Sequence, residues 1–256
     1  MPTTSAVAPR PPEQQMLGQT VVVIGGSSGI GLETARQARA AGADVVLSGR
    51  NRERLERAAL ELNAVSTAAF DATDAARLER FFEDLPAPID HVMVTAGTPY
   101  YARLADIDFT NARRNVDEHL WLTLQVAHAA ADRVRPAGTL LFMSSTLARR
   151  PGVGLVIAAA VNAMMPALTA ALALELAPVR VNLIAAGFVD TPLSASLLGD
   201  RIEQRRTQLR ATLPIRRVVG PEDIAALALH LMTNTAVTGA TYDIDGGEQL
   251  ISNSGT

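Results

Sequence analysis

The segment VVVIGGSSGIG (21–31) constrains the fold of this chain more than any other stretch. A β-branched run leads into Gly25, Gly29 and Gly31, and the amphipathic segment GLETARQARAAG (31–42) follows at once. Where backbone amides approach a phosphate at a helix N-terminus, side chains have no room at the closest points. The segment therefore predicts a strand, a glycine-rich phosphate-binding turn and a helix, in that order.

Along the rest of the chain, short runs rich in β-branched residues alternate with amphipathic segments, which is typical of βα units that build a parallel sheet. Right-handed crossovers then place helices on both faces of the sheet. We predict an α/β fold with a single doubly wound Rossmann domain over residues 16–256, preceded by a flexible, Pro-rich arm over residues 1–15. Strands are predicted at 20–24, 44–48, 66–70, 90–95, 139–144, 179–184 and 241–245.

Composition narrows the range of partners. The formal net charge is -3 and the 23 basic residues are scattered along the chain, so no nucleic-acid partner is predicted. The Ala-rich stretch at 154–177 is interrupted by Asn162, Pro166 and Glu175, and the first residues lack the apolar core of a signal peptide. We therefore predict a cytoplasmic protein that binds no membrane and no metal and acts on a small-molecule substrate.

Several motifs beyond the glycine-rich turn follow in an order that resembles the short-chain dehydrogenase/reductase superfamily. The similar segments, in chain order, are GGSSGIG (25–31), FDATD (70–74), VTAG (94–97), RVNLIAAGFVDTPL (180–193), GPEDIA (220–225), VTG (237–239) and DGG (245–247). Val94 and Thr95 replace two asparagines of the family's motif, and Ala186 replaces a proline. The resemblance implies a seven-stranded parallel sheet in the order 3-2-1-4-5-6-7 and a homodimer or homotetramer assembled through helices at 107–133 and 154–177.

The resemblance also implies a bound nicotinamide dinucleotide. Its predicted contacts are Gly25, Ser27, Ser28, Gly29, Ile30, Gly31, Arg50, Asn51, Asp71, Ala72, Thr95, Ala96, Gly97, Asn162, Gly187, Val189 and Thr191. The charge at the end of the second predicted strand indicates which dinucleotide is bound. An NAD(H) enzyme usually places a carboxylate there against the ribose 2′-hydroxyl, whereas this chain has Gly49 followed by Arg50, which can bind a 2′-phosphate. We therefore predict NADP(H) as the cofactor.

The resemblance breaks at the catalytic residues. The family completes hydride transfer with a tyrosine, a lysine four residues later, an upstream serine and a helix asparagine. When the sequence is aligned on ALTAALALEL (167–176), the tyrosine position falls on Ala158, the lysine position on Asn162 and the serine position on Ser145. All 23 basic residues are arginine, so the chain has no lysine to place elsewhere.

The asparagine position of the family falls on His119, and a shift of one helical turn would place Asn115 there instead. The imidazole of His119 can donate a proton at about pH 7 without help from a lysine, although a lone helical histidine can equally be a packed core residue. Tyr100 follows the fourth predicted strand closely enough to reach a substrate, but a tyrosine that nothing activates has a pKa of about 10. The predicted catalytic residues are therefore Ser145, His119 and Tyr100.

Three classes of function remain open. An NADP(H)-dependent oxidoreductase with a substituted proton donor would reduce a conjugated C=C bond more readily than a ketone, because hydride adds at carbon and the enolate needs only hydrogen bonds. A catalytically inactive NADP-binding protein or partner subunit could reuse the same site, and so could a non-redox enzyme such as a cyclase or dehydratase. The segment at 193–217 is expected to form a substrate lid, with Leu193, Leu197 and Leu198 as its apolar contact surface.

Overall fold

In the computed structural model, which describes residues 14–150 and 152–251, seven parallel strands form one sheet in the order β3-β2-β1-β4-β5-β6-β7. The strands are β1 (Thr20–Ile24), β2 (Asp44–Gly49), β3 (Ser66–Ala69), β4 (Ile89–Val94), β5 (Val134–Ser145), β6 (Arg180–Ala186) and β7 (Thr241–Ile244). The α-helices are α1 (Gly29–Ala40), α2 (Arg52–Leu62), α3 (Ala75–Asp84), α4 (Phe109–Val116), α5 (Leu122–Ala130), α6 (Val156–Glu175), α7 (Pro192–Leu198), α8 (Ile202–Thr212) and α9 (Pro221–Thr233). The predicted α/β fold and its strand order are confirmed, while most of the predicted arm at 1–15 lies outside the described residues.

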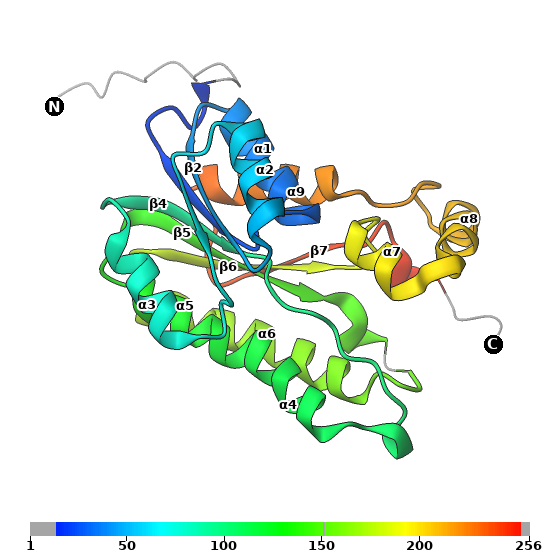
Figure 1. The fold of residues 1–256 in the computed structure, drawn as a ribbon. Coiled ribbons are helices and arrows are strands. Elements are labelled where there is room, and N and C mark those ends of the chain that lie inside the picture. The colour runs from blue at the N-terminus through cyan, green and yellow to red at the C-terminus, as the bar shows by residue number, and fades with distance from the viewer. Residues whose placement is uncertain (1–13, 151, 252–256) are drawn as a thin grey trace, which may run out of the picture.

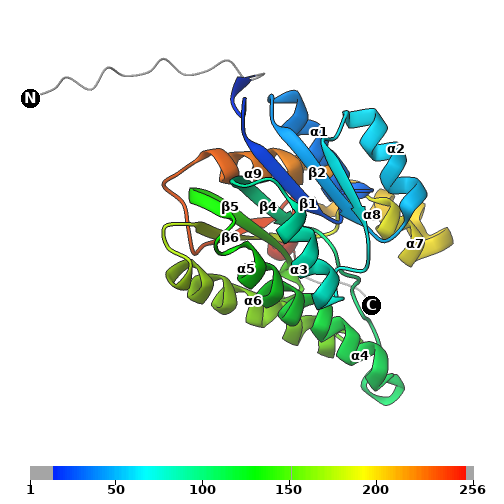
Figure 2. The same ribbon diagram turned by 60° about the vertical axis from the view of Figure 1, so that its left-hand side comes forward.

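Helices cover both faces of the sheet, and each face has its own apolar core (Figures 1 and 2). α1, α2 and α9 lie on one face, and α3, α5 and α6 lie on the other. β1 shows the alternation, because Val21 and Val23 pack under the first group of helices while Val22 and Ile24 pack under the second. Since both faces are covered, the carboxyl ends of the strands form the edge at which a ligand can bind.

β1 has its predicted bounds, five strands differ from theirs by one or two residues at one or both ends, and β5 differs most. β5 begins at Val134, whereas the sequence pattern predicted a start at residue 139. The proline in VRPAG interrupts the pattern, yet Val134 pairs with Ile89 before the register shifts, and Ala137 then takes a φ of 65°. A bulged segment therefore precedes the regular part of the strand.

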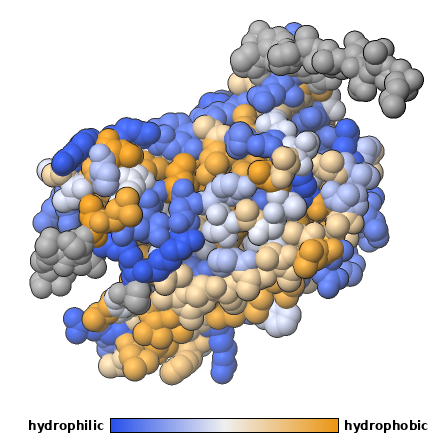
Figure 3. Space-filling model, turned by 180° about the vertical axis from the view of Figure 1, so that it is seen from behind, coloured by the Kyte–Doolittle hydropathy of each residue, from blue (hydrophilic) through white to orange (hydrophobic). Residues whose placement is uncertain are grey.

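α6 is the long apolar helix of the chain, and by length and composition alone it could cross a membrane. Here it packs against β6 and β5, and Met165 and Leu172 on its buried side belong to the core. Its outer side remains apolar, with Leu174 82% exposed. Seen from behind, apolar residues gather along the lower edge of the molecule, on the side of the sheet that α4, α5 and α6 cover (Figure 3).

The predicted lid segment forms an excursion from the sheet that contains α7 and α8. It begins after Val189 and returns at Val219, and these two residues form a parallel β-bridge. The Asp190 N–H donates a hydrogen bond to the carbonyl oxygen of Val219 at 2.9 Å, which closes the base of the excursion. Figure 1 shows both helices beyond the carboxyl ends of the strands, at the right of the view.

Candidate functional site

A cavity of about 420 Å³ opens at the carboxyl ends of β1, β2 and β4 and reaches α7. The strand order reverses between β1 and β4, and open parallel sheets bind ligands at this position. The predicted cofactor contacts that line the cavity are Gly25, Ser27, Ser28, Gly29, Ile30, Gly31, Arg50, Asn51, Asp71, Ala72, Thr95, Ala96, Gly97 and Thr191. The sequence therefore located most of the residues that surround this space.

The turn after β1 has no room for side chains at two of its glycines. A Cβ on Gly31 would lie 2.4 Å from the carbonyl oxygen of Gly25, and a Cβ on Gly25 would lie 2.6 Å from Oγ1 of Thr95. Gly25 also has a φ of +97°, which favours glycine. Ser28 caps α1 without a side-chain hydrogen bond, so the first N–H groups of the helix stay open to an anion.

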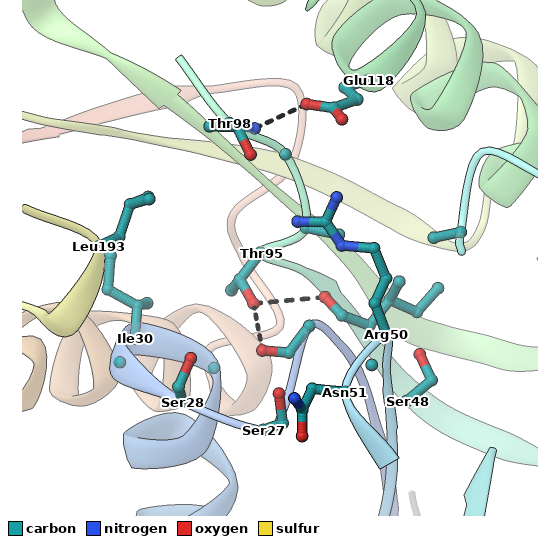
Figure 4. Close-up of a pocket in the computed structure, with 18 of the residues that line it drawn as sticks. Ser27, Ser28, Ile30, Ser48, Arg50, Asn51, Thr95, Thr98, Glu118 and Leu193 are labelled. Atoms are coloured by element: carbon teal, nitrogen blue, oxygen red, sulfur yellow. Dashed lines mark hydrogen bonds between the residues drawn. The ribbon is translucent and has the colours of Figure 1, made fainter. Parts of the chain in front are cut away.

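Thr95 holds the end of β4 against this turn. Its hydroxyl lies 3.3 Å from the carbonyl oxygen of Ile24 and 3.2 Å from that of Gly25, and it donates to both (Figure 4). The family resemblance placed an asparagine at this position. A threonine hydroxyl has one proton to share between the two carbonyls. Thr95 therefore connects the end of β4 to the end of β1 through a side chain smaller than asparagine.

Asp71 stands at one end of the cavity, in the loop after β3. Its carboxylate accepts hydrogen bonds from the backbone N–H of Thr73 at 3.1 Å and from the Thr73 hydroxyl at 2.8 Å, and it pairs with Arg114 at 3.2 Å. Partial burial favours the neutral acid, but the bonds from Thr73 and the charges of Arg50 and Arg114 together lower the pKa of Asp71 below its ordinary value. Asp71 therefore stays an ionised acceptor at neutral pH.

Two arginines lie at the same end of the cavity. Arg50 follows β2 directly and points across the space in Figure 4, and Arg54 lines the wall from the first turn of α2. Asn51 caps this helix by accepting a hydrogen bond from the Arg54 N–H at 2.8 Å. Arg52 lies outside the cavity, 4.0 Å from Glu56 on the helix surface. The sequence did not single out Arg54, although its place three residues after a capping Asn51 puts it on the first helical turn.

The loop after β4 is held by two side chains from the helix that follows it. The carboxylate of Glu118 accepts a hydrogen bond from the Thr98 N–H at 2.7 Å (Figure 4), and the amide of Asn115 donates to the Thr98 carbonyl at 2.7 Å. Arg114 donates to Glu118 at 3.0 Å and so connects this loop to Asp71. Glu118 is buried and lines the cavity, and sequence reasoning missed it because no motif marks the position.

His119 lies in a π-helical turn, Asp117–Trp121, between α4 and α5. Its Nδ1 lies 2.8 Å from the carbonyl oxygen of Asn115, which can only accept, so Nδ1 carries the proton of this bond. A Cβ on Gly97 would lie 3.7 Å from Cε1 of the ring, so His119 stands behind the loop that lines the cavity without lining it. The two residues considered for the asparagine position, His119 and Asn115, are thus one turn apart and bonded to each other.

The polar atoms of Asn162 on α6 bond inside the protein. Oδ1 accepts from the Ser144 hydroxyl at 2.9 Å and from the Ser145 N–H at 2.6 Å, while Nδ2 donates to the carbonyl oxygen of Ala158 at 2.7 Å. Ala158 is 2% exposed, and Asn162 is also buried. The hydroxyl of Ser145 accepts from the Leu147 N–H at 3.3 Å. Asn162, Ala158 and Ser145 all lie outside the cavity wall.

Tyr100 also has a partner within the protein. Its hydroxyl accepts a hydrogen bond from the Asp108 N–H at 2.7 Å, just before α4. Neither Tyr100 nor Tyr101 lines the cavity, and burial raises the pKa of Tyr101 above its ordinary value. The Tyr101 phenol is therefore a weaker acid than a free tyrosine.

The far end of the cavity is formed by the start of α7. Thr191 caps this helix by accepting from the Ser194 N–H at 3.2 Å, and Leu193 and Ser196 face the cavity. Gly187 and Val189 precede this segment and lie outside the cavity wall. Further wall residues that sequence reasoning did not single out for the site are Ile24, Ser48, Phe70, Thr73, Thr98, Leu122, Met143, Pro192 and Ser196. Within residues 14–150 and 152–251, no group of His, Cys, Asp and Glu side chains could hold a metal ion.

Comparisons with known proteins give consistent matches. A family model described as enoyl-(acyl carrier protein) reductase matches residues 24–249. The chain is 29% identical to the short-chain dehydrogenase/reductase ATR9 of Stachybotrys chlorohalonatus, over 91% of this chain and 98% of that protein. The MalC reductase/Diels-Alderase from Malbranchea aurantiaca superposes with a TM-score of 0.86 at 25% identity, over 94% and 100% of the two chains. A small-chain dehydrogenase in complex with NADPH gives a TM-score of 0.79 at 28% identity, over 91% and 99%.

Proposed function

The chain belongs to the short-chain dehydrogenase/reductase superfamily of NAD(P)-dependent oxidoreductases, and from this premise we propose that it is an NADP(H)-dependent enzyme with an atypical active site. Its reaction is the reduction of a conjugated C=C or C=O bond in a small apolar substrate. The observation that carries the proposal is the cavity, because its glycine-rich turn, the open start of α1 and a pair of arginines suit a phosphorylated dinucleotide.

The preference for NADP(H) is supported by the charges at the end of β2. Gly49 stands where an NAD(H) enzyme usually has an acidic residue, so this position carries no negative charge. Arg50 and Arg54 both line the cavity. Two guanidinium groups can bind a 2′-phosphate through charge-assisted hydrogen bonds, whereas an acid there would repel it. One similar solved structure contains NADPH, which agrees with this assignment.

The preference for a conjugated substrate follows from the residues around the chemistry. A bound NADPH would supply the hydride, and reduction of an enone then needs one proton at carbon or at the enolate oxygen. Hydrogen-bond donors suffice to stabilise an enolate, so the reaction depends less on a strong acid than ketone reduction does. The matching family model, described as enoyl-(acyl carrier protein) reductase, covers reactions at a C=C bond and supports the same choice.

We assign the proton donor to His119, with Ser145 as the group that polarises the substrate oxygen and Tyr100 as the alternative donor. The Nδ1 proton of His119 is held by the Asn115 carbonyl, so only Nε2 is free to deliver a proton, and it carries one only when the ring is charged. The hydroxyls of Ser145 and Tyr100 each accept a hydrogen bond from a backbone N–H and keep their own proton to donate.

The proposal is tested by mixing the protein with NADPH and a panel of enones, ketones and quinones while following absorbance at the nicotinamide band. We expect NADPH to be consumed with at least one enone, and His119→Ala to slow the reaction by about 10²–10⁴-fold, the usual value of a general acid. Ser145→Ala should also slow it. His128→Ala is the matched control, because that histidine is exposed in the last turn of α5 and should leave the rate unchanged.

A non-redox reaction on the same site is the second candidate. It is favoured by the similarity to the MalC reductase/Diels-Alderase and by the lack of any lysine in this chain. Substrate conversion without NADPH consumption in the same panel would select this candidate. Tight NADPH binding with no conversion of any substrate would instead indicate an inactive NADP-binding protein or partner subunit. Full activity of His119→Ala would show that His119 is not the proton donor.

We further propose that the protein works in the cytoplasm as a homodimer or homotetramer. The apolar band along α4, α5 and α6 supports assembly, since Phe109, Trp121 and Leu174 are each more than half exposed there. Exposed apolar surface of this kind is typical of subunit contacts. Sedimentation of the purified protein at several concentrations would measure the oligomeric state.

A further inference from the structure

Glu248 lies close to the end of the described chain, yet its side chain joins two distant segments. Oε2 accepts a hydrogen bond from the Phe188 N–H at 3.1 Å, and Oε1 pairs with Nη2 of Arg205 on α8 at 2.5 Å. The Glu248 backbone carbonyl also accepts from Arg150. The side chain is 18% exposed, so this carboxylate is largely shielded from water.

The segment that Glu248 holds leads directly into the far end of the cavity. Phe188 comes between β6 and Thr191, and Thr191 lines the cavity together with Leu193 and Ser196 of α7. Phosphates at the start of α1 and a 2′-phosphate at Arg50 leave this far end for the nicotinamide half of a dinucleotide. A Cβ on Gly187 would lie 2.8 Å from Oε2 of Glu248, so the backbone of this segment rests on the carboxylate.

Glu248 also fixes α8 relative to the same segment. Arg205 pairs with Glu248 while its guanidinium lies 5.6 Å from the centre of the Phe188 ring, within the range of a cation–π contact. Next to it, Arg206 holds both oxygens of Asp190 at 2.9 and 2.7 Å, which anchors the helix at the base of the excursion. α7, between this anchor and the cavity, has no buried residue.

We propose that Glu248 is a positioning residue for the nicotinamide half of the cofactor site, acting through the Phe188 backbone and through Arg205. The inference rests on the proposed NADP(H) function, and it assigns to a residue beyond the last strand the task of holding the β6–α7 segment in place. Removal of the carboxylate should loosen the nicotinamide end of the cavity while leaving the adenosine end unchanged, because Arg50, Arg54 and Asp71 make no contact with Glu248.

The test compares two ligands by calorimetric titration: NADPH, and adenosine 2′,5′-bisphosphate, which has the adenine and the 2′-phosphate but no nicotinamide. For Glu248→Ala we expect NADPH to bind about tenfold more weakly while the bisphosphate changes less than about twofold, as loss of a charge-assisted contact at one end predicts. Glu248→Gln keeps an acceptor for the Phe188 N–H and should recover most of the NADPH affinity. Arg205→Gln removes only the ion pair and should weaken NADPH by about threefold.

Arg135→Gln is the matched control. Arg135 forms an ion pair with the buried Asp90, with Nε 2.9 Å from Oδ1, and neither residue lines the cavity. The variant should therefore leave the affinity for both ligands unchanged. Unchanged bisphosphate binding also shows that each variant is folded. Equal losses for both ligands, or no loss of NADPH affinity in Glu248→Ala, would overturn the inference and leave the NADP(H) site standing. If the unmodified protein binds neither ligand, the proposed function itself fails, and the inference fails with it.

Discussion

The proposed adenosine end and the proposed catalytic end of this site differ in whether their polar groups already have partners within the protein. At the adenosine end, the start of α1 has no side-chain cap, and Arg50 and Arg54 face the cavity. At the catalytic end, the side chains of Asn162 and Ser145 already bond to nearby backbone groups. Polar groups in the first region are available to a ligand, whereas those of Asn162 and Ser145 form hydrogen bonds within the protein. This difference agrees with the proposed cofactor site at the first end and leaves the buried amide of Asn162 bonded within the protein at the second.

The largest expected effect comes from filling the glycine-rich turn. In Gly31→Val the new side chain would begin 2.4 Å from the Gly25 carbonyl oxygen, so the turn has to move and the phosphate position is lost. We expect NADPH affinity to fall by more than about hundredfold, since the phosphates lose the backbone amides that hold them. Fluorescence titration measures the loss. Gly152→Ala is the control glycine, because its nearest neighbour is the flexible tip of Leu155, and wild-type affinity in Gly31→Val would contradict the account.

Removal of the two arginines should act on one cofactor only. In Arg50→Ala/Arg54→Ala we expect NADPH to bind about hundredfold more weakly, because two charge-assisted hydrogen bonds to the 2′-phosphate are lost, each worth about 1.5 kcal/mol. NADH affinity should change less than about twofold, since NADH has no phosphate there. Competition titration compares the two cofactors in the variant. Arg52→Ala, on the outer surface of α2, should alter neither, and an equal loss for both cofactors would remove the specificity argument.

Asn162→Ala tests whether the side chain of Asn162 stabilises the fold rather than binding the cofactor. The variant loses hydrogen bonds to Ser144, Ser145 and Ala158 in a buried setting, so we expect the free energy of unfolding to fall by about 2 kcal/mol. NADPH affinity should stay within about twofold of the original, because the buried amide does not line the cavity. Urea denaturation and NADPH titration give the two values. Asn111→Ala, at an exposed site, is the control, and a loss of affinity without a loss of stability would indicate a ribose contact instead.

A pH effect is expected at His91, which lies near the amino end of the central strand β4 and does not line the cavity. Burial, with the charges of Arg180 and Arg135, lowers the pKa of His91 to about 3, from an ordinary 6.5. The unfolded chain therefore takes up this proton first, so the stability contribution is complete above pH 6.5 and declines as the pH falls toward 3. Urea unfolding should show a slope of about 1.4 kcal/mol per pH unit from this group between about pH 6 and 4.

His91→Gln should flatten that slope, because glutamine can still bond to Gln19 but does not titrate. Near-equal slopes for the two proteins would assign the acid sensitivity to other groups.

The sequence predicted the fold and about half of the cavity wall, but not the contacts that Glu118, Glu248 and Asn162 make, for physical reasons. Glycines at Gly25 and Gly31 are required by contacts between neighbouring segments, so their spacing alone marks the turn. Glu118 and Glu248 carry no such mark, because each acts through contacts with segments distant in the sequence: the Thr98 backbone is 20 positions away and the Phe188 backbone 60. Nor does the sequence alone indicate that Oδ1 of Asn162 accepts hydrogen bonds from Ser144 and Ser145 on β5.

The central claim is that an intact NADP(H) site stands beside a catalytic end without its usual acid and base. It is tested most directly by calorimetric titration of the unmodified protein with NADPH and NADH under the same conditions. The account predicts that NADPH binds with one site per chain and at least about tenfold more tightly than NADH, as paired guanidinium contacts to a 2′-phosphate require. Binding of NADH as tight as that of NADPH, or no binding of either, would contradict it.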